Sequence, residues 1–260
     1  MSGFHAIKAD IQHTAKVISY PCGVYDIIAS SSPDFREKGW EDASAWAKPG
    51  RGGEATLADA KPKQEASEES MMRSMRRAKA RVRRLALAND FRWFVTLTLD
   101  QKMVDRYDAA AVVRKLQQWC SNQVKRRGLK YILVPERHKD GAIHFHGFFS
   151  DALEATASGH TDKAGHMIYN LPGWTLGFTA AIECYGDYPK AVAYCCKYIG
   201  KQGDKPAGRW YYSGGALAEP EVTYAEIGIR DLEEEFGEKV WTTYVPGRTI
   251  AVVNGIRKDG

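Results

Sequence analysis

The sequence predicts an α+β fold, an antiparallel β-sheet with helices on one face, extended at both ends of the chain. Several short segments between residues 92 and 183 carry the period-two alternation of half-buried strands. Other segments have apolar residues at helical spacing. The resulting order of strand, helix, three strands and helix suits an antiparallel sheet with helices on one face.

The composition indicates a globular protein that is not embedded in a membrane. The chain has 260 residues, of which 44% are hydrophobic and 27% charged. No apolar run approaches the roughly 18 residues of a transmembrane helix, and the first residues, MSGFHAIKAD, lack a signal-peptide pattern. The five cysteines lack zinc-site spacing, so we expect reduced thiols and a cytoplasmic location.

Both ends of the chain differ in character from its middle. Residues 15–30 indicate short strands interrupted at Pro21 and Gly23, whereas residues 31–67 are rich in Ser, Pro, Gly and Ala. We therefore expect an N-terminal extension and flexible linker over residues 1–66. At the other end, residues 216–260 form a C-terminal extension that begins with an acidic stretch.

The central domain, expected over residues 67–215, begins with a basic helix at about residues 67–89. Residues 71–84 hold seven cations and no acidic residue: Arg73, Arg76, Arg77, Lys79, Arg81, Arg83 and Arg84. Such a block can bind a polyanion such as DNA, or it can be a solvated helical face. The sequence leaves both interpretations open.

Four strands and two further helices follow in the central domain. In RWFVTLTLD, residues 92–100, Thr96 and Thr98 fall on one side of a strand, opposite Val95 and Leu97. The next elements are a helix at about 107–126, the strands KYILVPE, GAIHFHGFFS and WTLGFTAAIE, and the helix YPKAVAYCCKYIGK.

The strand GAIHFHGFFS carries two histidines on one face. His144 and His146 are two residues apart, so both point to the face that carries the threonines of the first strand. Asp140 and Gly141 indicate a hairpin turn before them. Glu136 precedes that turn and is the third candidate for this face.

Loop length decides where Glu136 lies. If the loop is Lys139–Gly141, with Gly141 in a left-handed conformation, Glu136 stands directly opposite His144 and shares its face. A two-residue loop would place Glu136 on the other face. Two imidazoles and one carboxylate suit a divalent ion that also binds substrate oxygens. The alternative is a surface carboxylate paired with Arg137.

The last helix groups tyrosines and lysines. Asp187 and Pro189 form a plausible helix start. At about 100° per residue, one narrow arc holds Tyr194, Lys197, Tyr198 and Lys201. The opposite arc holds Val192, Cys196 and Ile199. The helix therefore presents two phenols and two ammonium groups together, or is simply amphipathic.

With these motifs the chain resembles the HUH endonucleases, the rolling-circle replication initiators of plasmids and single-stranded DNA phages. FVTLTLD is similar to their first motif, HFH with Glu136 to the second, and YCCKYIGK to the third in its two-tyrosine form. The resemblance covers about residues 90–215. It implies a ferredoxin- or RRM-like palm and a place in the cytoplasm of a bacterial host.

The resemblance also implies a reaction. Mg²⁺ or Mn²⁺ on Glu136, His144 and His146 would orient a phosphate of single-stranded DNA at a replication origin. Tyr194 or Tyr198 would then attack it, giving a 5′-phosphotyrosine and a free 3′-OH that a host polymerase extends. The ammonium groups of Lys197 and Lys201 would favour phenolate. Because the chain has no GxxxxGK[ST] motif, a host helicase is implied as well.

Two alternatives remain at this point. A conjugative relaxase or a single-strand transposase would use the same chemistry. A non-catalytic nucleic-acid-binding regulator would use the histidines for a structural zinc instead. Trp93, Trp174 and the WYY at residues 210–212 are candidates for base stacking, with packing in the core as the alternative.

Overall fold

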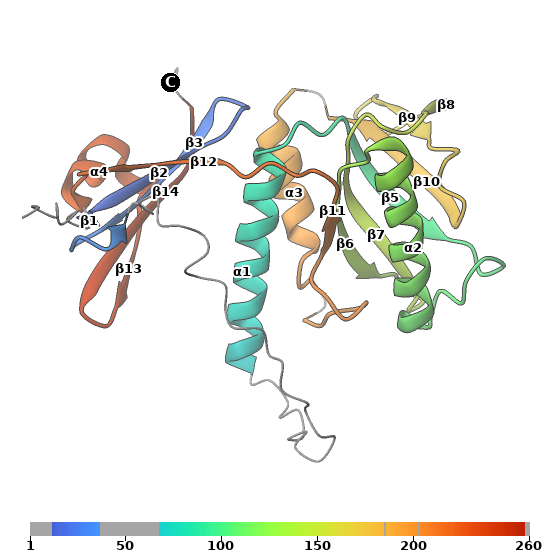
Figure 1. The fold of residues 1–260 in the computed structure, drawn as a ribbon, viewed down its shortest axis with the longest axis horizontal. Helices are drawn as coiled ribbons and strands as arrows, with labels where there is room; N and C mark the ends of the chain where they lie inside the picture. The colour runs from blue at the N-terminus through green and yellow to red at the C-terminus, as the bar shows by residue number, and fades with distance from the viewer. Residues whose placement is uncertain (1–11, 37–67, 185, 202, 258–260) are drawn as a thin grey trace, which may run out of the picture. The chain divides into compact units, whose positions relative to one another are not determined.

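The computed structural model describes residues 12–36, 68–184, 186–201 and 203–257. These residues divide into two compact units (Figure 1). One contains residues from both ends of the chain, up to Ala66 and from Glu221 onward, and the other contains Ser67–Pro220. The expected linker falls mostly outside the described residues. The two terminal extensions, which we expected to be separate, belong to one unit.

The first unit is a five-stranded antiparallel sheet with one helix over it. Its strand order is β12-β2-β3-β14-β13. The elements are β2 (Ala15–Ser19), β3 (Val24–Ser30), β12 (Glu221–Ala225), α4 (Ile229–Phe236), β13 (Trp241–Val245) and β14 (Arg248–Arg257), with the short pair β1 (Gln12–His13) and β4 (Phe35–Arg36) and a 3₁₀ turn, Gly237–Lys239. Leu232 of α4 packs on Ile27 and Ala251 of the sheet, which gives this unit its own core.

The second unit is built on a seven-stranded antiparallel sheet. Its strand order is β11-β6-β7-β5-β10-β9-β8. The elements are α1 (Glu68–Leu87), β5 (Trp93–Leu99), α2 (Ala109–Arg127), β6 (Tyr131–Arg137), β7 (Ile143–Phe149), β8 (Thr156–Thr161), β9 (Met167–Asn170), β10 (Gly177–Glu183), α3 (Tyr188–Tyr198) and β11 (Tyr212–Gly214). The predicted α+β class with an antiparallel sheet is confirmed.

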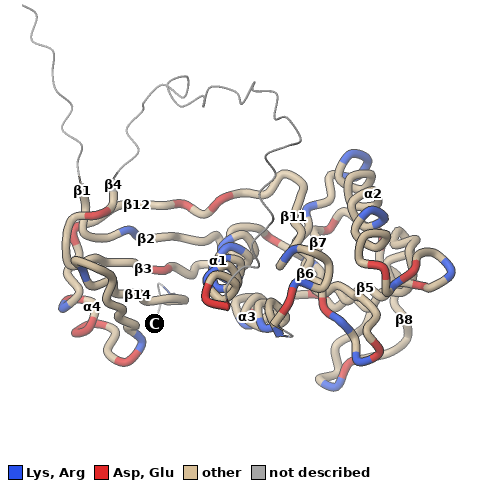
Figure 2. The backbone as a smooth tube through the Cα atoms, turned by 90° about the horizontal axis from the view of Figure 1, so that it is seen from below, with Lys and Arg blue, Asp and Glu red and all other residues tan. Residues whose placement is uncertain are grey.

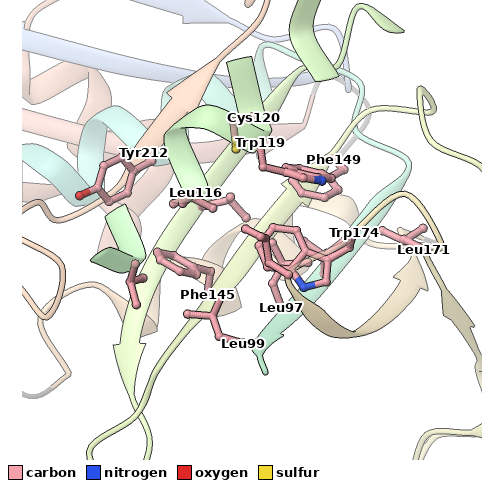
Figure 3. Packing of buried hydrophobic residues seen from close by; sticks show 14 of the residues in the cluster. Leu97, Leu99, Leu116, Trp119, Cys120, Phe145, Phe149, Leu171, Trp174 and Tyr212 are labelled. Carbon is pink, nitrogen blue, oxygen red and sulfur yellow. The ribbon is translucent and has the colours of Figure 1, made fainter. Parts of the chain in front are cut away.

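Helix α2 covers one face of this sheet and closes the larger core. In β5 every second residue is buried, and Leu97 packs with Leu116 and Trp119 of α2 (Figure 3). The helix starts at Asp108, whose carboxylate accepts hydrogen bonds from the backbone of the first turn. It ends at Gly128, whose φ of 67° is left-handed.

Helix α3 lies on the opposite face, so the expected arrangement with helices on one face is corrected. Its Tyr194 ring contacts Phe94 of β5, with centroids 5.8 Å apart, and Phe94 points away from the α2 core. The reason is visible in β7. Phe149 belongs to the α2 core, whereas Phe148 is fully buried on the other face, and a strand that is apolar on both faces needs cover on both.

Helix α1 packs beside α3 rather than on the sheet. The thiol of Cys196 lies 3.8 Å from the backbone oxygen of Lys79. Tyr188 at the start of α3 donates a hydrogen bond to the carbonyl oxygen of Ala86 (2.8 Å). None of the helices within the described ranges has the length and apolar character needed to cross a membrane.

Candidate active site

The β6–β7 hairpin has the register that the sequence predicts. The backbone N–H of His138 donates to the carbonyl oxygen of Ala142 (2.8 Å), and Gly141 has a φ of 89°. Lys139 to Gly141 therefore form a three-residue loop. Glu136 pairs directly with His144 across the ladder, so the two share one face of the sheet.

The threonines of β5 complete this face. Thr98 stands opposite His144, and Thr96 stands opposite His146. The hydroxyl of Thr96 lies 3.1 Å from Nδ1 of His146. Because that hydroxyl can donate to Nδ1, His146 is free to present an N–H at Nε2.

Glu136 is the electrostatic centre of the site. It is only 9% exposed, as is His146. One carboxylate oxygen lies 2.8 Å from Nε2 of His146, and the other accepts a hydrogen bond of 2.6 Å from Nζ of Lys201. Both oxygens of this buried carboxylate therefore have partners, which its burial requires.

Both candidate histidine ligands are neutral near pH 7. Burial lowers the pKa of His146 to about 4, against the opposing influence of Glu136. Burial and the neighbouring His138 also lower the pKa of His144. The contact between His146 and Glu136 is thus a hydrogen bond from a neutral imidazole. Neutral imidazole is the form that ligates metal ions.

The donor set suits a divalent cation, although the side chains do not converge on one point. Across the described part of the chain, no group of three or more His, Cys, Asp or Glu side chains forms a metal-binding cluster. The ring of His144 lies edge-on to His138, with centroids 4.9 Å apart, and Lys201 holds one oxygen of Glu136. Metal binding at Glu136, His144 and His146 would need Lys201 to release that oxygen.

Helix α3 places both phenols at this site. The Tyr198 ring stacks on the imidazole of His146, with centroids 4.0 Å apart and planes 14° apart. The Tyr198 hydroxyl donates to the Tyr194 hydroxyl (2.7 Å). Tyr194 is 49% exposed. The two phenols thus form a pair that extends from the buried histidine to solvent.

The lysines lie near these rings but act differently from the sequence expectation. Lys197 and Lys201 lie 6.0 Å and 5.5 Å from the ring centroids of Tyr194 and Tyr198, respectively. Burial raises the pKa of Tyr198, and the hydrogen bond with Tyr194 raises it further. We expected adjacent ammonium groups to lower it. The hydrogen bond to Glu136 raises the pKa of Lys201, so its charge is directed at the carboxylate.

Two details of the tyrosine helix correct the sequence interpretation. The buried stripe consists of Val192, Cys195 and Ile199, because Cys196 is only half-buried beside α1. The helix also ends at Tyr198, so Lys201 lies beyond it. The turn through Gly200, at a φ of 73°, is left-handed, and Lys201 after it reaches Glu136.

Residues 92–203 match the family model of the replication-associated protein ORF2. The match includes β5, the β6–β7 hairpin and α3, and thus every residue of the site described above. It supports a place in a replication initiator family and, with it, a role in DNA replication. No curated protein and no solved structure gives a significant match to the chain.

The basic residues predicted to bind DNA are distributed along α1 (Figure 2). Arg76 and Arg77 are exposed, whereas Arg81 makes a two-pronged ion pair with Glu219 at 2.5 and 2.6 Å. Arg73 lies 3.6 Å from Glu69. Lys79, Arg83 and Arg84 are half-buried. The proposed DNA contacts of all seven residues stay a prediction.

Most of the aromatic residues suggested for base stacking are in the core. Trp93, Trp174, Trp210 and Tyr212 are all buried, which excludes a base from their faces in this structure. Tyr211 is half-buried. The reason is that the odd-numbered residues of β5 face α2, where Trp93 and Trp174 join the same cluster.

Sequence reasoning missed two basic groups beside the histidines. Arg106, from the loop before α2, and His138 line a cavity of about 200 Å³ together with Thr98, Asp140 and His144. Arg106 is held there by an ion pair of 2.8 Å with Asp140. His138 had a signal, since it flanks the hairpin turn. Arg106 had none, because its position depends on a loop with no period.

Proposed function

We propose that this protein is a rolling-circle replication initiator that nicks and rejoins single-stranded DNA through a covalent 5′-phosphotyrosine. The observation that carries the proposal is the stack of Tyr198 on His146, with the Tyr194 hydroxyl 2.7 Å from that of Tyr198. A pair of nucleophilic phenols thus stands beside two neutral imidazoles and a carboxylate. The match to a replication-associated family supports the same conclusion.

The reaction is a transesterification in which bonds are exchanged one for one. A tyrosine oxygen attacks the phosphorus of a phosphodiester, and the bond from phosphorus to O3′ breaks. The departing O3′ takes up a proton and becomes a free 3′-OH, while the 5′ side stays on the enzyme as a phosphotyrosine. Attack by a 3′-OH on that phosphotyrosine reverses the step and rejoins DNA.

Each element of the site has a task in this scheme. Mg²⁺ or Mn²⁺ on Glu136, His144 and His146 would polarise a non-bridging phosphate oxygen, an effect typically worth several kcal/mol. Tyr194 and Tyr198 share a hydrogen bond, so loss of a proton from one phenol is stabilised by donation from the other. Once a metal replaces it on Glu136, Lys201 would be free to offset the charge of the phosphate or phenolate.

Two tyrosines suit a cycle with two cuts. The first would hold the 5′ end from the initial nick, and the second would cut the newly made origin while that end is still attached. The DNA would be a single-stranded origin, and a host helicase and polymerase in the bacterial cytoplasm would complete replication. A conjugative relaxase or single-strand transposase would share the nicking step but not the polymerase.

The test uses single-stranded DNA of random sequence, labelled at the 3′ end or the 5′ end, with Mn²⁺. We expect the 3′ label, but not the 5′ label, to migrate with the denatured protein, because the 5′ phosphate of the downstream fragment is retained. Tyr194→Phe combined with Tyr198→Phe should abolish this adduct. Tyr244→Phe, which changes an exposed tyrosine of the first unit, is the matched control. DNA binding without any adduct would instead identify a non-catalytic regulator.

A further inference from the structure

One large aromatic side chain of the second unit stays in solvent on the same sheet face as the site. Phe178 of β10 is 67% exposed. In contrast, Phe145, Phe148 and Phe149 of β7 are fully buried. A phenyl ring has no polar group, so its exposure gives up the free energy that burial would supply. Such exposure is informative when it lies beside a functional site.

The register places Phe178 in one row with the site. Phe178 pairs with Thr98 of β5, Thr98 pairs with His144 of β7, and His144 pairs with Glu136 of β6. Directly opposed residues point to the same face. Phe178 is therefore two strand spacings, roughly 10 Å, from His144.

The surroundings of Phe178 leave its ring open. On the outer side of β10, the neighbouring strand β9 pairs only at Ala181, so no strand flanks the row of Phe178 there. The next residue on the same face is Ala180, which is small. Within the described residues, no aromatic ring contacts Phe178.

We propose that Phe178 is a stacking platform for a nucleobase next to the scissile phosphate, an inference that rests on the proposed function. A base has flat π-faces that match an exposed phenyl ring, and such stacking is tolerant of sequence. Thr98, which separates Phe178 from His144, also lines the cavity that holds Arg106 and His138. A strand that stacks on Phe178 can therefore lay its phosphates along a basic, polar surface that leads to the tyrosines.

The test compares binding of two fluorescent probes, an oligo-dT and an abasic oligomer of equal length with the same sugar-phosphate backbone. For Phe178→Ala we expect the Kd for oligo-dT to rise about 5- to 100-fold, the range for loss of one stacked base. The Kd for the abasic oligomer should not change. Phe178→Trp should bind oligo-dT at least as tightly as the wild type. Phe178→Leu is the matched control, because it keeps an apolar side chain without a flat ring, and it should behave like Phe178→Ala.

Each other result has one meaning. Equal binding of oligo-dT by the wild type and Phe178→Ala overturns the stacking platform, as does an equal loss for both probes. If the wild type still forms the covalent adduct in either case, the proposed function stands and only the platform is wrong. A wild type that neither binds oligo-dT nor forms an adduct contradicts both.

Discussion

Stability of the metal-free protein should fall in mild acid because of one buried histidine. Burial lowers the pKa of His146 in the folded chain to about 4 from 6.5. The unfolded chain therefore binds a proton more readily than the folded chain, and acid favours unfolding. The contribution of His146 is fully present above about pH 6.5, declines below it, and stops changing below about pH 4.

The magnitude follows from these two pKa values. Between pH 7 and pH 5, proton binding by the unfolded chain alone lowers the free energy of unfolding by about 2 kcal/mol. Because His146 is only 9% exposed, little screening by solvent reduces this figure. The loss approaches about 3 kcal/mol at pH 4, where half of the folded molecules carry the proton.

Urea denaturation at several pH values, in the presence of a chelator, measures this loss. His146→Gln keeps a polar side chain beside Glu136 but cannot titrate, so its stability should fall by about 2 kcal/mol less than that of the wild type between pH 7 and pH 5. His160→Gln, a change at an exposed histidine of β8, controls for the loss of a histidine as such. Parallel pH profiles for the wild type and His146→Gln would refute the reasoning that this imidazole is buried and neutral.

Two further predictions concern the hairpin and the basic helix. Gly147→Ala should lower the free energy of unfolding by several kcal/mol (about 3 or more), because its Cβ would lie 1.9 Å from the carbonyl oxygen of Ile132; thermal unfolding checks this against Gly173→Ala, whose Cβ would meet only a side chain at 3.7 Å, and equal melting temperatures would contradict the close strand approach. Replacing the exposed Arg76 and Arg77 with Gln should reduce the slope of log Kd against log salt for single-stranded DNA by about one unit each, and an unchanged slope would make α1 a solvated face.

The site was predictable where local chemistry determines the geometry. Asp140 and Gly141 specify a turn, and its length fixes the parity of every later residue in β7. A three-residue loop is therefore enough to place Glu136 and His144 on one face. Helical periodicity likewise grouped Tyr194 and Tyr198, because four residues of a helix bring side chains together.

Features that depend on pairing between distant segments were not predictable. Nothing in the alternation of β10 says that Phe178 pairs with Thr98, because register between non-adjacent strands leaves no local signal. The union of the two terminal segments in one sheet has the same cause. The position of Lys201 was missed because the helix ends three residues before it, at a turn through Gly200 that lets the chain leave the helical arc.

The central claim is that either phenol of α3 can carry the DNA, and the most direct measurement is the site of the covalent link. The adduct formed with Mn²⁺ is digested with nuclease and protease, and mass spectrometry locates the modified residue. We predict nucleotide on Tyr194 in Tyr198→Phe, on Tyr198 in Tyr194→Phe, and none in the double variant. An adduct that persists in the double variant would contradict the account. If one single variant forms no adduct and the other keeps full multi-turnover processing, the protein is a single-tyrosine enzyme instead.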